Sequence, residues 1–400
     1  MQSSFGASQF RGGLFDEPAL RDFAQSVRHA LAAPDVSLGL VFLTPGLMSD
    51  AAQVQEIVRV HAQVPLLVGC SSAGVIAGDR EWEETQGVAL GLYHLPGARL
   101  DPVRFTQTQV EEANGRAYWH QETRVSPEDN RGWLVVADPF HLDAEAWLQG
   151  WNEAYPGRPV AGGLAGGDFA NRRTQVYLNG EVHEEGGVAL SVGGDVRLAT
   201  VVSQGCTPIG ETWTITRAER NIIHHIGNRP AYEVLLETYN RLTQEEQKKS
   251  QGNLFVGLVV NEYRDEFHHG DFLIRNLLGA DPRTGSLAVG AWPRTGQTLQ
   301  FQRRDAEVAS DDLKTLLFQA REHLHGRQVL GGCLFACNGR GRRMFGRPHH
   351  DAGLVQSQLA PPGLTGFFCS GELGPVGDRN FLHGFTASLA LFVHEPAEQG

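Results

Sequence analysis

The chain has 400 residues and a formal net charge of −12 at pH 7. One hydrophobic core rarely extends beyond roughly 250–300 residues, so we expect two domains. The negative charge argues against nucleic acid or anionic membranes as partners, and no apolar run reaches the ~18 residues of a membrane-spanning helix. The N-terminus lacks the basic and apolar segments of a signal peptide, and the five cysteines are sparse. Both features favour reduced thiols and a cytoplasmic location.

The first 36 residues are predicted to form an N-terminal extension with one amphipathic helix. We expect the residues up to Gly13 to be frayed. Asp16, Glu17 and Pro18 are typical of a first helical turn, and apolar residues then recur at helical spacing. The helix should end before Pro34.

One pattern occurs three times along the chain: a strand, a turn, a helix, a second strand and a glycine-containing loop. The first strand is predicted at residues 38–43, 133–136 and 334–337. The second strand is predicted within 65–74 and 159–167, which include the glycine-containing loop, and at 364–369. Helices are expected to begin at Ser49 and Asp143 in the first two copies. Because identity between the copies is low, we interpret the pattern as a structural pseudo-repeat. It predicts an α+β fold in which mixed β-sheets are covered by helices.

The remaining elements are assigned from turn and periodicity signals. Asn179-Gly180 predicts a type I′ hairpin between residues 175–178 and 181–183. Residues 111–130 are expected to form an irregular connection, and the boundary between the two domains is expected between residues 228 and 229. The later segment predicts a strand at 254–260, a hairpin from 271–278 and 286–291, a strand at 298–303 and a helix capped by Ser310.

Only the third copy carries a cluster of arginines, and we place the candidate ligand site there. If the strands at 334–337 and 364–369 run parallel, the loops that follow them emerge at one edge of a sheet. The guanidinium groups would then face a row of backbone N–H groups, a suitable place for a small anion. The predicted ligand-binding residues are Asn338, Arg340, Arg342, Arg343, Ser370, Gly371, Glu372 and Gly374.

This site is predicted to bind a carboxylate-bearing metabolite such as an amino acid, whose ammonium group would be held by Glu372. The alternative is a solvated loop, or arginines held in structural ion pairs, with Glu372 as one partner. A charge-assisted pair contributes about 1.5–3 kcal/mol, whereas micromolar affinity needs about 8 kcal/mol. Backbone donors around residues 370–374 would therefore have to supply further hydrogen bonds.

Five segments resemble the FIST family, a sensory module built from a FIST N and a FIST C domain. They are VPLLVGCSSAGVIAG (64–78), VVSQGCTPIGE (201–211), FLIRNLLGADPRTG (272–285), LFACNGRGRRMFG (334–346) and GFFCSGELGPVGDRNFLHG (366–384). The resemblance implies a FIST N-like domain at 37–228 and a FIST C-like domain at 229–395. It also implies small-ligand binding in intracellular signal transduction, with amino acids or related metabolites as ligands. The family offers no catalytic residues to carry over.

Family relatives are often fused to kinases, cyclases, chemoreceptor modules or an F-box, and we expect a signalling protein as the partner of this chain. Ligand binding would order residues 338–346 and alter the surface that this partner contacts. A protein-interaction scaffold is an alternative. It predicts a large exposed apolar patch and a collapsed pocket.

A cysteine-dependent enzyme is a second alternative. Cys337 and Cys369 end the two strands beside the candidate site, either as buried apolar side chains or as reactive thiols with His383 as a base. Cys70, Ser71 and Ser72 occupy the equivalent place in the first copy. They are expected either to cap a helix or to line a secondary pocket.

No metal or cofactor is predicted. The adjacent histidines at 224–225, 268–269 and 349–350, the last followed by Asp351, do not match a helical two-ligand spacing such as HExxH. None of the glycine runs has the P-loop lysine or the Rossmann spacing with its acidic partner. Nucleotide binding is therefore not expected.

Overall fold

The computed structural model describes residues 5–264, 266–267 and 270–396, which divide into two compact units. The larger unit comprises residues 1–202, 313–382 and 386–400, and the smaller unit comprises residues 203–312 and 383–385. These units divide the chain differently from the expected boundary at 228 and 229. Helices account for 27% and strands for 42%, which confirms the mixed α/β class.

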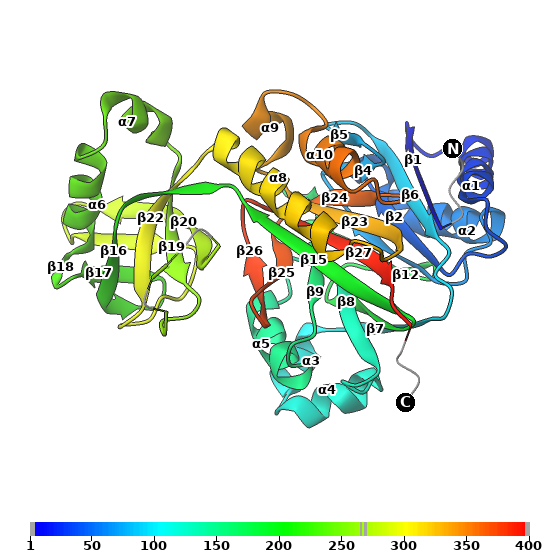
Figure 1. Cartoon of the computed structure of the whole chain (residues 1–400), viewed down its shortest axis with the longest axis horizontal. Coiled ribbons are helices and arrows are strands. Elements are labelled where there is room, and N and C mark those ends of the chain that lie inside the picture. The colour runs from blue at the N-terminus through cyan, green and yellow to red at the C-terminus, as the bar shows by residue number, and fades with distance from the viewer. Residues whose placement is uncertain (1–4, 265, 268–269, 397–400) are drawn as a thin grey trace. The chain divides into compact units, whose positions relative to one another are not determined.

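The described part of the larger unit contains three six-stranded sheets (Figure 1). The first sheet has the order β1 (Gly6–Gly12), β6 (Gly87–Tyr93), β2 (Leu38–Leu43), β3 (Leu67–Ser71), β12 (Val176–Leu178) and β13 (Glu181–His183). The second has the order β7 (Ala98–Phe105), β14 (Gly187–Gly194), β8 (Asn130–Ala137), β9 (Val160–Leu164), β25 (Glu372–Val376) and β26 (Arg379–His383). The third has the order β15 (Val196–Gln204), β27 (Thr386–His394), β23 (Val329–Cys337), β24 (Thr365–Cys369), β4 (Gly74–Ala77) and β5 (Arg80–Glu83). A short ribbon, β10 (Gly167–Asp168) with β11 (Arg173–Thr174), lies apart from these sheets.

Each sheet combines one copy of the predicted repeat with a hairpin from another copy. The repeat's two strands pair in parallel, β2 with β3, β8 with β9 and β23 with β24, which fulfils the condition set for the third copy. The hairpin β12–β13 of the second copy joins the first sheet, β25–β26 of the third copy joins the second sheet, and β4–β5 of the first copy joins the third. Because this exchange is cyclic, the larger unit has a pseudo-threefold layout.

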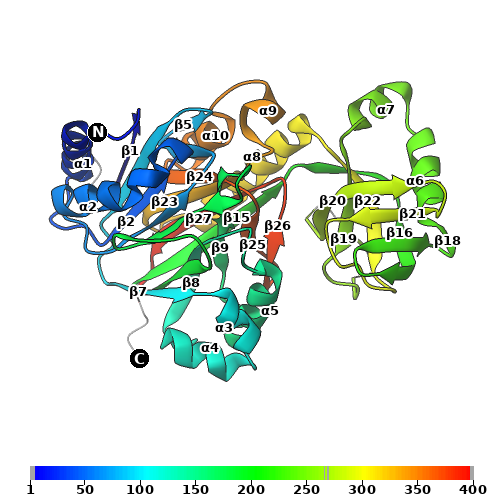
Figure 2. The same ribbon diagram turned by 180° about the vertical axis from the view of Figure 1, so that it is seen from behind.

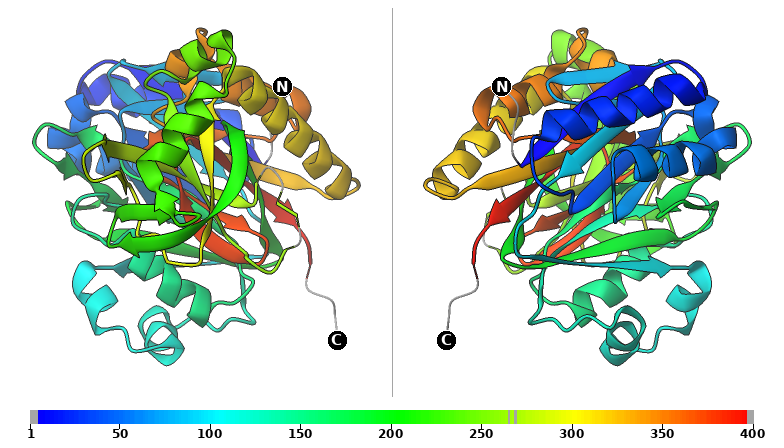
Figure 3. Two further views of the ribbon diagram at one scale, coloured as in Figure 1. Left: turned by 90° about the vertical axis from the view of Figure 1, so that its left-hand side faces the viewer. Right: turned by 90° about the vertical axis from the view of Figure 1, so that its right-hand side faces the viewer.

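Alternation of side chains along the strands gives each sheet two buried faces. Residues such as Phe42, Val136 and Phe335 point inward, and the three inner faces share one hydrophobic core. The opposite faces carry separate cores, each covered by helices. The covering helices are α1 (Glu17–Leu31) and α2 (Ala51–His61) on the first sheet, α3 (Gln107–Glu112), α4 (Arg116–Thr123) and α5 (Ala144–Ala154) on the second, and α8 (Ala306–His323) from Leu313 onward with α10 (His350–Gln358) on the third. Figure 3 shows α1 and α2 side by side over the first sheet.

The smaller unit is built on one seven-stranded sheet (Figure 2). Its order is β16 (Cys206–Glu219), β22 (Thr298–Arg304), β19 (Leu254–Val259), β20 (Phe272–Asp281), β21 (Ser286–Val289), β17 (Ile222–Ile226) and β18 (Arg229–Pro230). β16 also pairs with β17, so the sheet closes on itself around a hydrophobic core that includes residues of α6 (Ala231–Asn240). α7 (Gln244–Ser250) follows α6. The predicted strands and hairpin of this region are confirmed.

Several local predictions have clear outcomes. Asp16 caps α1 by accepting a hydrogen bond from Ala19 N–H at 3.0 Å, as its position predicts. The expected fraying before Gly13 is wrong, because residues 6–12 form β1, whose backbone pairs with β6. Residues 111–130 are not irregular, since α4 lies within them. No helix among the described residues is long and apolar enough to cross a membrane.

Both predicted serine caps are wrong. Ser49 belongs to the 3₁₀ helix η1 (Pro45–Asp50), where its hydroxyl donates to Asp50 at 2.9 Å. Ser310 lies inside α8, which begins four residues earlier. In both cases the regular structure begins before the polar residue that resembles a cap.

A glycine recurs at the same place in the second strand of each parallel pair. A Cβ atom on Gly69, Gly162 or Gly366 would lie 1.7, 2.0 and 1.9 Å, respectively, from a backbone carbonyl oxygen of the neighbouring strand. Because backbone atoms inside a sheet cannot move far, we expect Gly69→Ala and Gly366→Ala each to lower the free energy of unfolding by about 3 kcal/mol or more. Chemical denaturation measures this effect.

Gly353→Ala is the matched control for these two variants. Gly353 lies inside α10, and the nearest atom to an added Cβ is Asp79 O at 4.0 Å. Alanine is the better helix former, so this variant is expected to gain about 0.5–1 kcal/mol. Similar small changes for all three alanine variants would contradict the close approach of the parallel strands.

Candidate functional site

The turns that follow β3, β9 and β24 lie against one another in the larger unit. Ser71 Oγ donates to the Gly166 carbonyl oxygen at 2.6 Å, and Ser370 Oγ donates to the Ala165 carbonyl oxygen at 2.9 Å. In addition, Ser72 Oγ donates to a carbonyl oxygen of β24 at 3.0 Å. We call this meeting point, residues 71–73, 165–167 and 369–371, the three-turn junction. It brings the equivalent loops of all three copies together.

A pocket of about 510 Å³ opens at the three-turn junction. Its lining residues are Ala73, Gly74, Glu83, Glu84, Phe169, Cys337, Asn338, Arg343, Phe368, Cys369 and Ser370. Hollows of similar volume lie beside α8 and beside η1. We take the first pocket as the candidate site because it combines charged, amide, hydroxyl and aromatic side chains from all three copies, including several that the sequence predicts.

The predicted residues Asn338, Arg343 and Ser370 are brought together in this pocket. Asn338 Nδ2 and Ser370 Oγ are 3.5 Å apart, at the limit of a hydrogen bond. Arg343 is exposed on α9 (Gly341–Phe345) and forms no ion pair with another described residue. Its neighbour Arg342 is also exposed but does not line the pocket, and its backbone N–H donates to Glu83 Oε1 at 2.8 Å.

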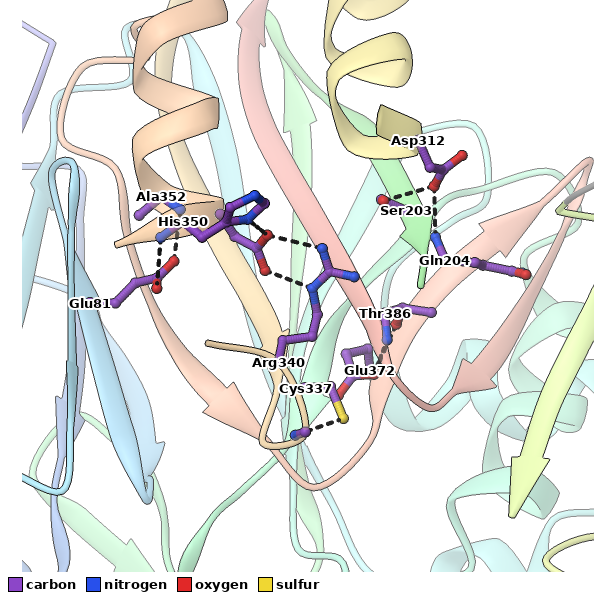
Figure 4. Close-up of polar contacts among 12 residues, drawn as sticks. Glu81, Ser203, Gln204, Asp312, Cys337, Arg340, His350, Ala352, Glu372 and Thr386 are labelled. Atoms are coloured by element: carbon purple, nitrogen blue, oxygen red, sulfur yellow. Dashed lines mark hydrogen bonds and ion pairs between the residues drawn. The ribbon is translucent and has the colours of Figure 1, made fainter. Parts of the chain in front are cut away.

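Arg340 does not reach the pocket, contrary to the predicted role in ligand binding. Its side chain is fully buried and forms a bidentate pair with Asp351, with Nε to Oδ2 at 2.6 Å and Nη2 to Oδ1 at 2.9 Å (Figure 4). Burial alone would raise the pKa of Asp351, but the Arg340 guanidinium outweighs this effect and the pKa falls to about 2. Arg340 is thus a structural arginine, the alternative that the sequence left open.

The buried pair belongs to a network that joins α10 to β5. Glu81 on β5 accepts backbone hydrogen bonds from His350 at 3.2 Å and from Ala352 at 2.8 Å, and so caps the start of α10. Burial, with nearby Asp351, raises the pKa of Glu81 to about 7. This network fixes the segment that carries Arg343 onto the hairpin exchanged from the first copy.

The predicted counter-acceptor Glu372 is also buried and does not line the pocket. Its Oε2 accepts hydrogen bonds from Thr386 N–H at 3.2 Å and Thr386 Oγ1 at 2.8 Å. The predicted row of unpaired N–H groups is used elsewhere. Ser370 N–H donates to Leu164 O at 2.9 Å, and residues 372–376 form β25 against β9. Gly371 and Gly374 lie in this paired backbone, not in the pocket lining.

Two protein-family models match this chain. The FIST N domain matches residues 37–229, and the FIST C domain matches residues 231–375. An uncharacterized protein of Mycobacterium tuberculosis (strain H37Rv) is 36% identical over 375 residues, which cover 94% of this chain and 96% of that protein. The chain belongs to the FIST family.

The other similarities add little to this assignment. An uncharacterized protein of Mycobacterium bovis is 36% identical over 93% of this FIST chain and 94% of its own length, and one of Methanocaldococcus jannaschii is 22% identical over 66% of this chain and 51% of its own. A cyanuric acid hydrolase structure aligns with 98% of this chain and 100% of its own, with a TM-score of 0.36 and 9% identity. A TM-score this low carries no argument about the FIST protein.

The two candidate thiols of the FIST protein differ in environment. Cys369 is fully buried, and desolvation raises its pKa, which disfavours a reactive thiolate. Cys337 is half-buried and lines the pocket. His383, the suggested base, belongs to the smaller unit, whereas both cysteines belong to the larger. A role for His383 stays a prediction.

Cys70, Ser71 and Ser72 do not line the pocket at the three-turn junction. All three side chains are fully buried. Ser71 Oγ donates to the Gly166 carbonyl oxygen of the three-turn junction, and Ser72 Oγ donates to a carbonyl oxygen of β24. The following residues, Ala73 and Gly74, instead line the main pocket. The first copy therefore contributes to one shared site.

The structure describes two of the three histidine runs. Neither His224 nor His225 on β17 belongs to any group of three or more potential ligands, and the described residues contain no such group. His349 Nδ1 accepts a hydrogen bond from Glu81 N–H at 2.9 Å, and His350 Nδ1 lies 2.9 Å from Asp351 Oδ1. The pair at 268–269 lies outside the described residues.

Three residues that line the pocket, Glu83, Glu84 and Phe169, were not predicted from the sequence. Glu83 and Glu84 follow a strand of the first copy, and their approach to the third copy depends on the hairpin exchange. Phe169 follows the glycine run of the second copy and is 47% exposed. The structure shows a φ of 54° at Glu84, which places a non-glycine residue in the left-handed region, but the sequence does not indicate this conformation.

Proposed function

We propose that this FIST protein is a sensory protein that binds a small carboxylate-bearing metabolite in the pocket at the three-turn junction. One observation carries the proposal. Arg343 lines this pocket with Asn338 and Ser370 and has no anionic partner among the described residues. A guanidinium with an amide and a hydroxyl nearby forms a suitable set of donors for a carboxylate.

An amino acid fits the charge pattern of the lining. Glu83 and Glu84 place two carboxylates on the same pocket as Arg343. A zwitterion can pair its carboxylate with Arg343 and its ammonium group with these glutamates. In this proposal Glu83 and Glu84 bind the ammonium group. Glu372 does not, because its carboxyl group is buried and does not line the pocket.

The required affinity exceeds what one arginine supplies. A charge-assisted hydrogen bond contributes about 1.5–3 kcal/mol, whereas a Kd of 1 μM requires about 8 kcal/mol. The remainder has to come from Asn338, Ser370 and apolar contact with Phe169 and Phe368. We therefore expect ligands with an apolar side chain to bind more tightly than glycine.

A signal can leave the site through α9. Arg343 lies on this helix, and the adjacent Arg342 N–H holds Glu83 of the exchanged hairpin at 2.8 Å. A ligand that contacts both Arg343 and Glu83 stabilises one arrangement of helix and hairpin over others. The exposed surface of α9 would then be recognised by a partner protein in the liganded state.

Isothermal titration calorimetry tests the proposal. The panel contains apolar amino acids, their 2-oxo acids and the corresponding amines without a carboxylate. Wild type is expected to bind members with a carboxylate and to reject the amines. Arg343→Gln is expected to weaken binding about 10-fold or more, because loss of a charged hydrogen bond costs about 1.5–3 kcal/mol.

Arg342→Gln is the matched control. The two arginines are consecutive on α9, but Arg342 contacts Glu83 through its backbone, which the substitution retains. Its affinity for the same ligand should equal that of wild type. Equal weakening in both variants would indicate a general effect of loop charge, and binding of the amines would rule out the carboxylate.

A further inference from the structure

Cys337 presents a thiol to the proposed ligand. It is the last residue of β23, is half-buried and lines the pocket. Its Sγ accepts a hydrogen bond from Gly339 N–H at 3.4 Å, a contact that favours the thiolate form. The other cysteines, Cys70, Cys206, Cys333 and Cys369, are at most 1% exposed. A reagent in solvent therefore reaches Cys337 first.

A buried carboxyl group lies beside this thiol. Glu372 is 0% exposed, and its Oε1 accepts no N–H or O–H hydrogen bond from the residues that the structure describes. Figure 4 shows the Cys337 and Glu372 side chains next to each other. Thr386 holds the other oxygen and so fixes the orientation of the carboxyl group.

The carboxyl group of Glu372 is a stronger base than an ordinary carboxylate. Burial raises the pKa of Glu372 to about 8, although hydrogen bonds from Thr386 and the charge of Arg340 oppose this effect. A general base is most effective when its pKa lies near the operating pH. Glu372 is therefore a suitable proton acceptor for the neighbouring thiol.

We propose that Cys337 and Glu372 form a nucleophile–base pair that adds reversibly to the electrophilic carbonyl carbon of a 2-oxo acid in the pocket. The inference rests on the proposed function in one respect, since Arg343 would hold the carboxylate next to that carbonyl. Asn338, which also lines the pocket, supplies an amide donor for the carbonyl oxygen. Covalent capture would distinguish 2-oxo acids from 2-hydroxy acids of the same size.

The addition balances without a further reactant. The thiol proton of Cys337 passes to Glu372, and the sulfur forms a bond to the carbonyl carbon. The electron pair of the C=O π bond moves to the oxygen, which then takes the proton from Glu372. The net change is addition of S–H across C=O, and the reverse sequence releases the ligand.

Alkylation with iodoacetamide tests the nucleophile–base pair directly. In this reaction the S–C bond forms, the C–I bond breaks, iodide leaves with its electron pair and Glu372 takes the thiol proton. We expect one fast modification of the folded protein, located at Cys337 by peptide mass spectrometry and absent from Cys337→Ser. Glu372→Gln keeps the shape of the side chain and is expected to slow the modification about 10-fold or more.

Protection by pyruvate tests covalent capture. Pyruvate is expected to slow the iodoacetamide reaction at concentrations where lactate, which lacks the electrophilic carbonyl, does not. Arg343→Gln should remove this protection, whereas Arg342→Gln, whose side chain does not line the pocket, should retain it. Circular dichroism and thermal unfolding of each variant show that the fold is retained.

The outcomes separate the inference from the proposed function. Equal alkylation rates for wild type and folded Glu372→Gln would overturn the pair, and equal protection by pyruvate and lactate would overturn covalent capture. Fast, Glu372-dependent alkylation without carboxylate binding in calorimetry would support the pair and overturn the proposed function. Protection by pyruvate that depends on both Glu372 and Arg343 would support both.

Discussion

Arg340→Ala is expected to lower the free energy of unfolding by about 3–5 kcal/mol, because it leaves the Asp351 carboxylate buried without its partner. Both side chains are at most 1% exposed, and two hydrogen bonds of 2.6 and 2.9 Å join them. The guanidinium also lies 5.3 Å from the centre of the Phe345 ring. Urea denaturation at pH 7 measures the loss.

The neighbouring arginines provide the comparison. Arg342→Ala and Arg343→Ala remove exposed side chains from the same helix, and each is expected to change the free energy of unfolding by no more than about 0.5 kcal/mol. The double variant Arg340→Met/Asp351→Leu should recover much of the loss, because replacing both charges by apolar groups leaves no buried charge unpaired. Equal effects of Arg340→Ala and Arg343→Ala would contradict the buried pair.

The Arg340–Asp351 pair contributes more to the free energy of unfolding at neutral pH than in acid. The folded-state pKa of Asp351 is held at about 2, below its ordinary value of 3.8. The stabilisation from the pair is therefore present above pH 4 and is lost as the pH falls toward 2. Arg340→Ala should remove this acid-dependent part of the stability.

The three arginines show why part of the site was predictable and part was not. Their shared loop, between two strands that are parallel, correctly indicated an edge where charged groups meet the turn at Ser370. Periodicity and turn signals do not specify which of three nearby arginines turns inward. Asp351, eleven residues after Arg340, is the partner that decides it.

The exchange of hairpins between copies is a second feature that could not be predicted from the sequence. Apolar runs and Asn179-Gly180 correctly predicted the local hairpin β12–β13, since both turn residues have positive φ as a type I′ turn requires. Alternation of side chains along a segment indicates a strand, but it does not indicate which distant strand pairs with it. The sequence therefore gave no reason to place Glu83 and Glu84 of the first copy against Arg343 of the third.

Strand pairing was also missed at residues 370–374, which were predicted to form a loop. Their glycines and Glu372 are typical of a ligand-binding turn, and the prediction assigned free N–H groups to them. The antiparallel pairing of β25 with β9 uses this backbone instead, in register Glu372 to Gly163 and Leu373 to Gly162. Because the strand is short and contains glycine and proline, propensity favoured a loop.

Glu372→Gln is expected to make the protein more stable than wild type at pH 9 while leaving the two proteins similar near pH 5. The folded-state pKa of Glu372 is about 8, raised by burial from an ordinary value of 4.5. The folded protein therefore holds a proton that the unfolded chain releases between these values. Wild type loses free energy of unfolding as the pH rises from about 4.5 through 8.

The size of this effect follows from the displacement of the pKa. At about 1.36 kcal/mol per pKa unit, a rise from 4.5 to about 8 corresponds to on the order of 5 kcal/mol. Glutamine resembles the protonated acid, and its amide oxygen can still accept from Thr386, so the variant lacks this loss. Glu81, whose pKa is raised to about 7, titrates in both proteins and cancels in the comparison. Unfolding free energies that run parallel from pH 5 to pH 9 would show that Glu372 is already ionised in the folded protein, and would remove the raised pKa that makes Glu372 a strong base beside Cys337.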